Sequence, residues 1–219
     1  MSRGAPITRR GMIRRTLAGG LALAAGGLLD ARDRAAGAEG TPVVVMQGVD
    51  PETLDPHFGE SGVMGNVLSN LMEPLVYYDR RMNLVPFLAE SYRVLDDKVT
   101  WRFVLRQGIK FQNGQPFNAD AVKFTVERTL DPKLRAQGLN DPFPSRSGVA
   151  RVAVQSATTV DIVLKSPNVI LPVFLTFLYI LEPRYYSATP PQRTAVAPVG
   201  TGAWQVREWV KGDHLTMVA

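Results

Sequence analysis

Residues 87–124 constrain the fold of this chain most, because strand, turn and helix signals follow one another there without a gap. Val99, Trp101 and Phe103 alternate with Thr100 and Arg102. This period of two is expected of a strand that buries one face. Two aspartates at positions 96 and 97 supply a turn just upstream. The pattern therefore predicts two strands joined as a hairpin.

A second turn and a helix follow the hairpin. Asn113 and Gly114, followed by Pro116, are typical of a turn. Asn118 is suited to cap a helix that carries Val122 and, further on, residues 126 and 130 at helical spacing. The predicted order is strand, turn, strand, turn, helix, which indicates a mixed α/β fold.

Other segments extend this pattern. Residues 61–75 place apolar side chains at helical spacing, and Pro74 marks the end of that helix. Residues 158–164 alternate as a strand that could pair with residues 151–155. Residues 131–148 are rich in proline, glycine, serine and asparagine, which predicts a loop.

Two apolar runs also need an assignment. Residues 42–47 are expected to form the first strand. Residues 169–181 are nearly all apolar, but they are only thirteen in number and contain Pro172, whereas a membrane span needs about 20 residues. A buried helix or an irregular core segment is therefore predicted there.

A recurrent phrase runs through the same region. Residues 86–92 read PFLAESY, residues 100–106 read TWRFVLR and residues 108–122 read GIKFQNGQPFNADAV. This phrase resembles that of the family 5 substrate-binding proteins of ABC importers, which include dipeptide- and oligopeptide-binding proteins. Residues 53–57, TLDPH, and 198–204, PVGTGAW, resemble two further motifs of that family, with Ala203 and Trp204 where proline and tyrosine are usual.

The resemblance implies an α/β fold like that of the type II periplasmic binding proteins, in which two lobes close on a ligand. Residues 39–219 would be an incomplete first lobe, with a mixed sheet, β-hairpins and flanking helices, because members of the family are much longer. It implies a monomeric receptor, without enzymatic activity or cofactor, that captures peptides or another small solute for a permease in the inner membrane. A chain with one incomplete lobe is expected to bind peptides weakly or not at all.

The first 38 residues resemble an export signal. Arg9 and Arg10 precede an uncharged, glycine- and alanine-rich run at residues 17–29, and a small-residue pattern predicts cleavage after Ala38. These features favour a twin-arginine signal and a periplasmic location; an ordinary secretory signal with paired arginines is the alternative. The resulting domain division is a signal peptide at residues 1–38 and a partial lobe at residues 39–219.

The same segment explains the charge of the chain. The net charge is +5, but residues 1–38 contain seven arginines and two aspartates, so 18 basic and 18 acidic residues remain. The predicted mature chain is neutral, which argues against nucleic acid as a partner. The chain has no cysteine, which excludes a disulfide and a lipid attached at a signal-peptide cysteine.

The best candidate for ligand contact is the loop that carries Asp50, Pro51, Glu52 and Thr53. By resemblance this loop follows the first strand and faces the cleft between lobes, where the carboxylate of Asp50 or Glu52 could pair with a ligand ammonium. The alternative is that these residues only shape a turn, and that role is favoured for Asp55. Phe143 is a further candidate, as an exposed aromatic residue of the 131–148 loop.

Catalytic and metal-binding signals are weak. His57 and His214 are far apart in the sequence, lack partner patterns and are expected at the polar surface. Residues 200–202, GTG, are interpreted as a tight turn that needs the backbone freedom of glycine, because they lack the lysine and spacing of a phosphate loop. Two alternatives to solute binding stay open: an exported cofactor-dependent enzyme and an interaction domain without a small ligand.

Overall fold

The computed structural model describes residues 43–59, 61–136, 143 and 147–219. The chain divides into two compact units, residues 1–44 and 45–219, and all the helices and strands named below belong to the second. Arg9, Arg10 and the predicted cleavage position after Ala38 lie outside the described residues.

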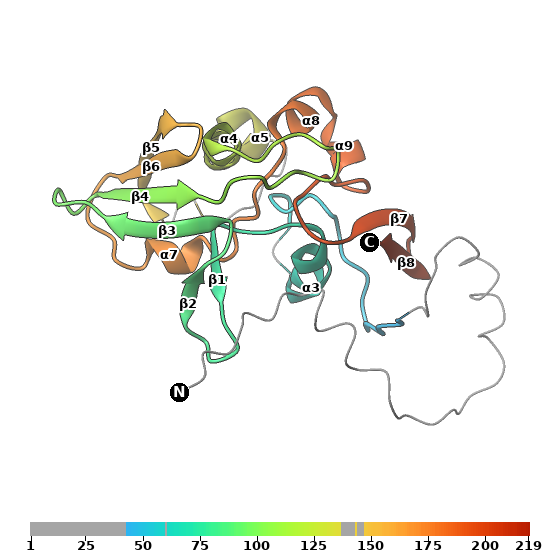
Figure 1. The fold of residues 1–219 in the computed structure, drawn as a ribbon. Helices are drawn as coiled ribbons and strands as arrows, with labels where there is room; N and C mark the ends of the chain where they lie inside the picture. The colour runs from blue at the N-terminus through green and yellow to red at the C-terminus, as the bar shows by residue number, and fades with distance from the viewer. Residues whose placement is uncertain (1–42, 60, 137–142, 144–146) are drawn as a thin grey trace. The chain divides into compact units, whose positions relative to one another are not determined.

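The centre of the second unit is a four-stranded antiparallel sheet with the order β3-β4-β6-β5 (Figure 1). Its strands are β3 (Ala89–Val94), β4 (Thr100–Leu105), β5 (Val149–Ser156) and β6 (Thr159–Leu164). Along β4, Trp101, Phe103 and Leu105 are buried, while Arg102 is half-buried. The predicted hairpin, its alternation and the pairing of the 151–155 and 158–164 segments are therefore confirmed.

Helix α4 (Ala119–Leu130) packs against β5 and β6 and covers the apolar face of the sheet (Figure 1). The predicted cap is present, because the Asn118 Oδ1 atom accepts a hydrogen bond from the Ala121 amide at 3.1 Å. Val122 and Val126 are fully buried in the core that they share with Phe103 and Ile162. The cap fixes where the helix begins, and the apolar face fixes how it lies on the sheet.

A second cluster of buried residues surrounds α3 (Gly62–Leu71). Met64, Leu68 and Leu71 form its helical part, in agreement with the predicted 61–75 helix, which ends earlier at Met72. The hairpin formed by β7 (Gln205–Val210) and β8 (His214–Val218) lays Trp209 and other half-buried side chains on this cluster. The cluster therefore joins an early helix to the last hairpin of the chain.

Gly200 and Gly202 lie against the end of α3. A Cβ atom at Gly200 would overlap the Leu71 carbonyl oxygen, and one at Gly202 would overlap the Asn70 carbonyl oxygen. The predicted turn is present. Glycine is needed there for close approach between backbone segments, since neither residue has a positive φ.

Gln112 forms hydrogen bonds to both of the backbone segments that meet at this contact. Its Nε2 atom donates to the carbonyl oxygens of Leu71 at 2.9 Å and Trp204 at 2.6 Å, and its Oε1 atom accepts from the Gly200 amide at 2.9 Å. One side chain thus satisfies backbone groups on two segments that are distant in sequence.

The remaining elements are short. A two-stranded hairpin joins β1 (Val76–Tyr78) to β2 (Leu84–Pro86), and single-turn or two-turn helices are α5 (Pro132–Ala136), α7 (Leu171–Phe174), α8 (Pro183–Ala188) and α9 (Pro191–Thr194). Helix α5 corrects part of the expected 131–148 loop. Its start is favoured because the Asp131 carboxylate accepts from the Lys133 amide at 2.8 Å and Pro132 can occupy a first helical turn.

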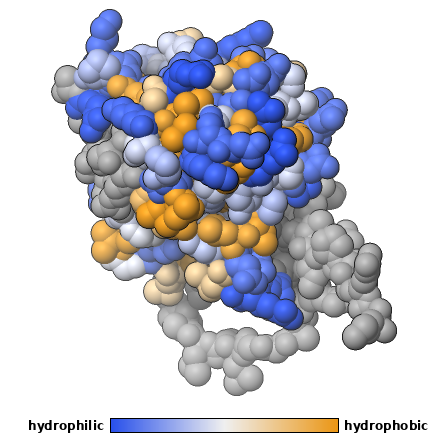
Figure 2. Space-filling view, turned by 90° about the vertical axis from the view of Figure 1, so that its left-hand side faces the viewer, coloured by the Kyte–Doolittle hydropathy of each residue, from blue (hydrophilic) through white to orange (hydrophobic). Residues whose placement is uncertain are grey.

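The apolar 169–181 segment is a core segment, as predicted: Leu171, Leu175 and Ile180 are fully buried. Two of its apolar side chains are exposed instead, Val169 at 84% and Phe177 at 74%. Figure 2 looks from the left-hand side of Figure 1, where the turn between β3 and β4 lies, and shows hydrophobic surface interrupted by hydrophilic residues. Among the described residues, no helix is long and apolar enough to cross a membrane.

The structure contradicts the first strand that was expected at residues 42–47. Within the second unit, Val45 and Met46 belong to no strand, and they are 83% and 94% exposed. A strand needs a hydrogen-bonding partner, and in the described part of the chain none pairs with this run. Residue-level propensity for strand was therefore not sufficient.

Candidate functional site

The loop at residues 50–57 is held at its outer end by the turn between β7 and β8. The Asp50 Oδ2 atom accepts a hydrogen bond from the Gly212 amide at 2.6 Å. Lys211 Nζ lies 3.4 Å from the Glu52 carbonyl oxygen, to which it donates, and 4.8 Å from the centre of the Trp209 ring. Gly212 has a φ of 78°, a conformation that favours glycine and directs its amide at the loop.

Glu52 is held by the start of α3. The Ser61 hydroxyl donates to Glu52 Oε2 at 3.0 Å and accepts from the Met64 amide at 3.3 Å, as a helix cap does. The carboxylate therefore lies at the positive end of a helix, where a negative charge is stabilised. Glu52 stays exposed, as does Asp50.

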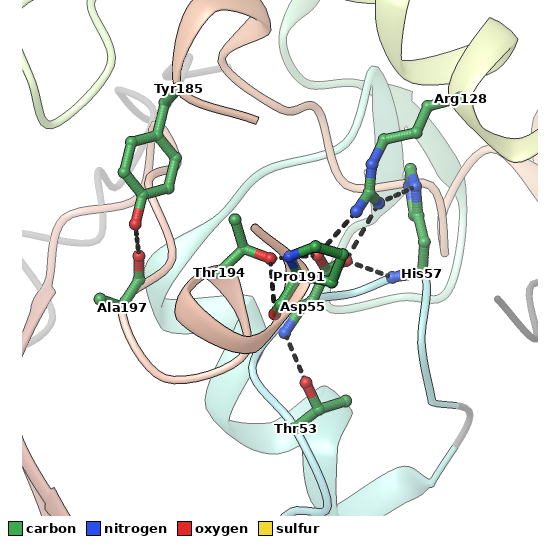
Figure 3. A network of polar contacts seen from close by, with 8 residues as sticks. All are labelled: Thr53, Asp55, His57, Arg128, Tyr185, Pro191, Thr194 and Ala197. Carbon is green, nitrogen blue, oxygen red and sulfur yellow. Dashed lines mark hydrogen bonds and ion pairs between the residues drawn. The ribbon is translucent and has the colours of Figure 1, made fainter. Parts of the chain in front are cut away.

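The inner end of the loop contains a buried ion pair (Figure 3). Arg128 Nη1 and Nη2 donate to Asp55 Oδ1 and Oδ2 at 3.0 and 2.7 Å, and the two side chains are 5% and 0% exposed. Thr194 at the end of α9 donates its hydroxyl to Asp55 Oδ2 at 2.7 Å. Such a two-point guanidinium–carboxylate pair compensates both buried charges.

Asp55 also shapes the turn, as expected. Its Oδ1 atom accepts from the His57 amide at 3.2 Å, and its own amide donates to Thr53 Oγ1 at 3.1 Å. The carboxylate thus has both the turn role and a long-range role that was not foreseen.

His57 is a correction to the expectation of a surface position. It is 1% exposed, and its Nδ1 atom lies 2.8 Å from Arg128 Nη1. Burial, together with the adjacent Arg128 charge, lowers the pKa of His57 to about 3, while Asp55 opposes that shift. The imidazole is therefore neutral at physiological pH, with Nδ1 as the acceptor and the proton on Nε2.

Aromatic rings enclose the guanidinium. The Arg128 carbon Cζ lies 5.5 Å from the centre of the Phe58 ring and 5.4 Å from that of the Tyr186 ring. Burial raises the pKa of Tyr186 well above its ordinary value, so its hydroxyl is neutral. The charges of Asp55 and Arg128 compensate each other and both residues are buried, which suits the network to holding the loop in place.

The four candidate contact residues divide into two pairs. Asp50 and Glu52 are exposed, whereas Pro51 and Thr53 are buried. Side chains that could meet a ligand in this loop are therefore the two carboxylates.

His214 lies on the same hairpin as Gly212, half-exposed, with Nδ1 2.9 Å from Asp213 and Nε2 3.5 Å from Glu208.

Phe143 is also a correction. It was expected as an exposed aromatic residue, but it is 3% exposed and belongs to the main core with Val149 and Leu171. Burying a large aromatic ring is the more favourable use of its apolar surface.

Sequence reasoning missed Arg128, Thr194, Lys211 and Gly212. Arg128 carried no usable local signal: it lies on the opposite side of the predicted helix from residues 122, 126 and 130, and only the structure shows that this side is buried too. A charged residue on that face needs a buried partner. The identity of that partner, 73 positions away, is not encoded in any local pattern.

A hollow of about 690 Å³ adjoins the buried network, between α4 and the segment that joins α8 to α9, and Arg128 is one of its lining residues. Glu127, Asp131 and Tyr186 are among its lining residues, and the four candidate contact residues are not. The described residues contain no group of three or more histidine and acidic side chains arranged to hold a metal ion.

Comparisons with known proteins agree on one group. The family model "Bacterial extracellular solute-binding proteins, family 5 Middle" matches residues 83–219. The glutathione-binding protein GsiB of Escherichia coli K12 is 34% identical over 180 residues, which cover 79% of this chain and 33% of that protein. The chain thus spans about one third of the length of the curated relatives it matches.

Solved structures share the fold. The protein AgaA of A. tumefaciens R10, in complex with agropinic acid, superposes with a TM-score of 0.69 at 29% identity and covers 77% of this chain and 34% of that one. OppA of Haemophilus influenzae, in complex with the peptide RPPGFSPFR, gives a TM-score of 0.70 at 24% identity and covers 78% and 36%. At that lower identity the second likeness concerns the fold alone.

Proposed function

The chain belongs to the bacterial extracellular solute-binding proteins of family 5, and from this premise we propose that it is part of the substrate-binding component of an ABC importer. The family consists of solute-binding proteins, so the alternative of an exported cofactor-dependent enzyme is not favoured. The α/β fold, shared with solved binding proteins of this type, agrees with that membership.

One observation carries the proposal for the site: Asp50 and Glu52 are exposed on a loop whose two ends are fixed. The Gly212 amide holds Asp50, the Ser61 hydroxyl holds Glu52, and the buried Arg128 pair holds the inner end. Recognition residues work best on segments that a rigid scaffold positions, because little ordering is then needed on binding. We assign Asp50 and Glu52 side-chain contacts, and Pro51 and Thr53 backbone contacts.

The two carboxylates favour a ligand that carries an ammonium group, such as a peptide or a related small solute. The similarity to a glutathione-binding protein supports a small peptide-like solute. Binding of that solute would shift the population of the whole binding protein from an open to a closed two-lobed form, and the membrane permease would recognise the closed form. The permease is the proposed partner.

Export belongs to the same proposal. Residues 1–38 act as a twin-arginine signal, with Arg9 and Arg10 as its paired arginines and cleavage after Ala38, which leaves residues 39–219 as a partial N-terminal lobe in the periplasm. Replacing both arginines by lysine should leave the precursor in the cytoplasmic fraction. Processing and periplasmic recovery equal to the unaltered chain would contradict this route.

The ligand assignment is tested by NMR titration of the ¹⁵N-labelled chain with reduced glutathione and, separately, with dialanine up to about 10 mM, because isolated weak sites bind in this range. Shifts are expected at the amides of Asp50, Glu52 and Thr53 and at that of Gly212. Asp50→Asn and Glu52→Gln should diminish them, whereas Asp120→Asn, which removes an exposed charge from α4, should not.

Saturating shifts confined to another surface would refute the assignment to this loop. An absence of shifts with both probes, combined with stable capture of a protein partner without solute, would favour the ligand-free interaction domain.

A further inference from the structure

Asp55 collects hydrogen-bond donors from three separate parts of the chain. The His57 amide comes from the loop itself, two guanidinium nitrogens come from Arg128 on α4, and one hydroxyl comes from Thr194 at the end of α9. Arg128 contacts a second loop residue through His57 Nδ1 at 2.8 Å. A single guanidinium therefore fixes two positions of the same loop (Figure 3).

Rigid contacts connect this point to the exposed carboxylates. The Leu54 amide donates to the Ala195 carbonyl oxygen at 2.8 Å, and Thr53 Oγ1 accepts from the Asp55 amide. Both Leu54 and Thr53 are buried. Glu52 immediately precedes Thr53 in the chain. Both residues between Glu52 and Asp55 therefore have buried side chains.

We infer that Arg128 is a positioning residue for the candidate contact loop: through Asp55 and His57 it determines where Asp50 and Glu52 lie. The ligand-contacting role of this loop rests on the proposed function. The positional effect does not, because it concerns the loop in the absence of any ligand.

The chain offers a matched control for this role. Arg102 and Asp161 form another two-point pair, with Nε and Nη2 donating to the carboxylate at 2.8 and 2.7 Å. That pair joins β4 to β6, and Gln155 of β5 donates to the same carboxylate at 3.0 Å. It has the same chemistry as the Arg128 pair but none of its hydrogen bonds involves the loop.

The experiment is amide hydrogen exchange on the full chain without ligand, comparing Arg128→Lys, Thr194→Val and Arg102→Lys. Lysine keeps the charge but cannot make both bonds, so the variant isolates positioning from charge. In Arg128→Lys, the His57, Leu54 and Gly212 amides should exchange about 10- to 100-fold faster, as local opening becomes easier. Thr194→Val should produce a smaller increase at His57 and Leu54, and Arg102→Lys should leave all three within about 2-fold.

The Gly212 amide separates positioning from mere stability, because it contacts the loop only through Asp50. If Arg128→Lys lowers the melting temperature as Arg102→Lys does but leaves exchange at Gly212 and Leu54 unchanged, the inference is wrong. If Arg128→Lys fails to fold, Thr194→Val decides: unchanged exchange at His57 and Leu54 overturns the inference.

The two proposals fail separately. A loop that loosens in Arg128→Lys but shows no shifts with glutathione or dialanine removes the ligand assignment and keeps the positioning role. Shifts at the loop that are the same in Arg128→Lys and in the unaltered chain remove the positioning role and keep the ligand assignment.

Discussion

The carboxylate of Asp50 accepts a hydrogen bond from the amide of Gly212 at 2.6 Å, although 162 positions separate the two residues in the chain. This bond joins the exposed end of the candidate contact loop to the turn of the β7–β8 hairpin. The loop and the hairpin therefore form one unit of local structure, and changes in either are expected to appear in the other.

Asp50→Ala should release the hairpin turn without unfolding the protein. Asp50 is exposed, so the loss is that of one surface hydrogen bond, about 0.5–1.5 kcal/mol. Exchange of the Gly212 amide should rise by about 3- to 10-fold, because each 1.4 kcal/mol corresponds to a factor of ten. Asp50→Asn keeps an acceptor oxygen and should have a smaller effect; equal rates in all three chains would show that the bond does not stabilise the turn.

Gly200→Ala should be strongly destabilising because its Cβ would overlap the Leu71 carbonyl oxygen. Overpacking of this kind costs about 1–3 kcal/mol, and a backbone atom cannot move aside as a side chain can. Gly65→Ala is the matched control: it lies within α3 and a Cβ there meets no atom within 4 Å. That change should stabilise the helix by up to about 1 kcal/mol.

Chemical denaturation of both alanine variants tests this contrast. A Gly200→Ala midpoint equal to that of the unaltered chain would show that the backbone approach is looser than the structure has it.

His57 should make the protein sensitive to acid. Its folded-state pKa is about 3 because of burial and the Arg128 charge, whereas the unfolded imidazole titrates near 6.5. Below pH 6.5 the unfolded state binds a proton at His57 that the folded state does not bind. The contribution of His57 to the free energy of unfolding is therefore fully present above pH 6.5 and is lost progressively towards pH 3. The slope is about 1.4 kcal/mol per pH unit.

His57→Gln retains an acceptor but cannot titrate. The free energy of unfolding of this variant should therefore fall less between pH 6.5 and 4 than that of the unaltered chain. Parallel curves would place the imidazole in a solvated environment.

His214 should act in the opposite direction. Hydrogen bonding to Asp213, assisted by Glu208, raises the pKa of His214 above 6.5. The charged imidazole is favoured in the folded state, so its contribution is fully present below pH 6.5 and is lost as the pH rises through the raised value. The stability advantage over His214→Gln should be larger at pH 5.5 than at pH 8.5, and the ring-proton NMR titration should have its midpoint above 6.5.

Local patterns sufficed where structure depends on near neighbours. The alternation of Trp101 and Phe103 placed β4, and Asn118 placed the start of α4, because side-chain periodicity and capping act within a few residues. The same kind of reasoning failed for Val45 and Met46, since a strand also requires a partner elsewhere in the chain.

Only part of the candidate site could be predicted from the sequence. Resemblance pointed to Asp50, Glu52 and the turn at Asp55, but Arg128 and Gly212 approach that loop from distant positions. His57 and Phe143 were misplaced for a related reason: isolated polar or aromatic residues within loop-like sequence look exposed until tertiary packing encloses them.

The Thr194–Asp55 bond spans 139 positions, so the ribosome adds its two partners to the chain at very different times. At roughly 5–20 residues per second, Asp55 is added to the chain about 7–28 s before Thr194. Arg128 arrives earlier, so the guanidinium can neutralise the carboxylate first and the hydroxyl joins a pair that already exists. The order of translation thus places the charge-compensating partner ahead of the neutral one.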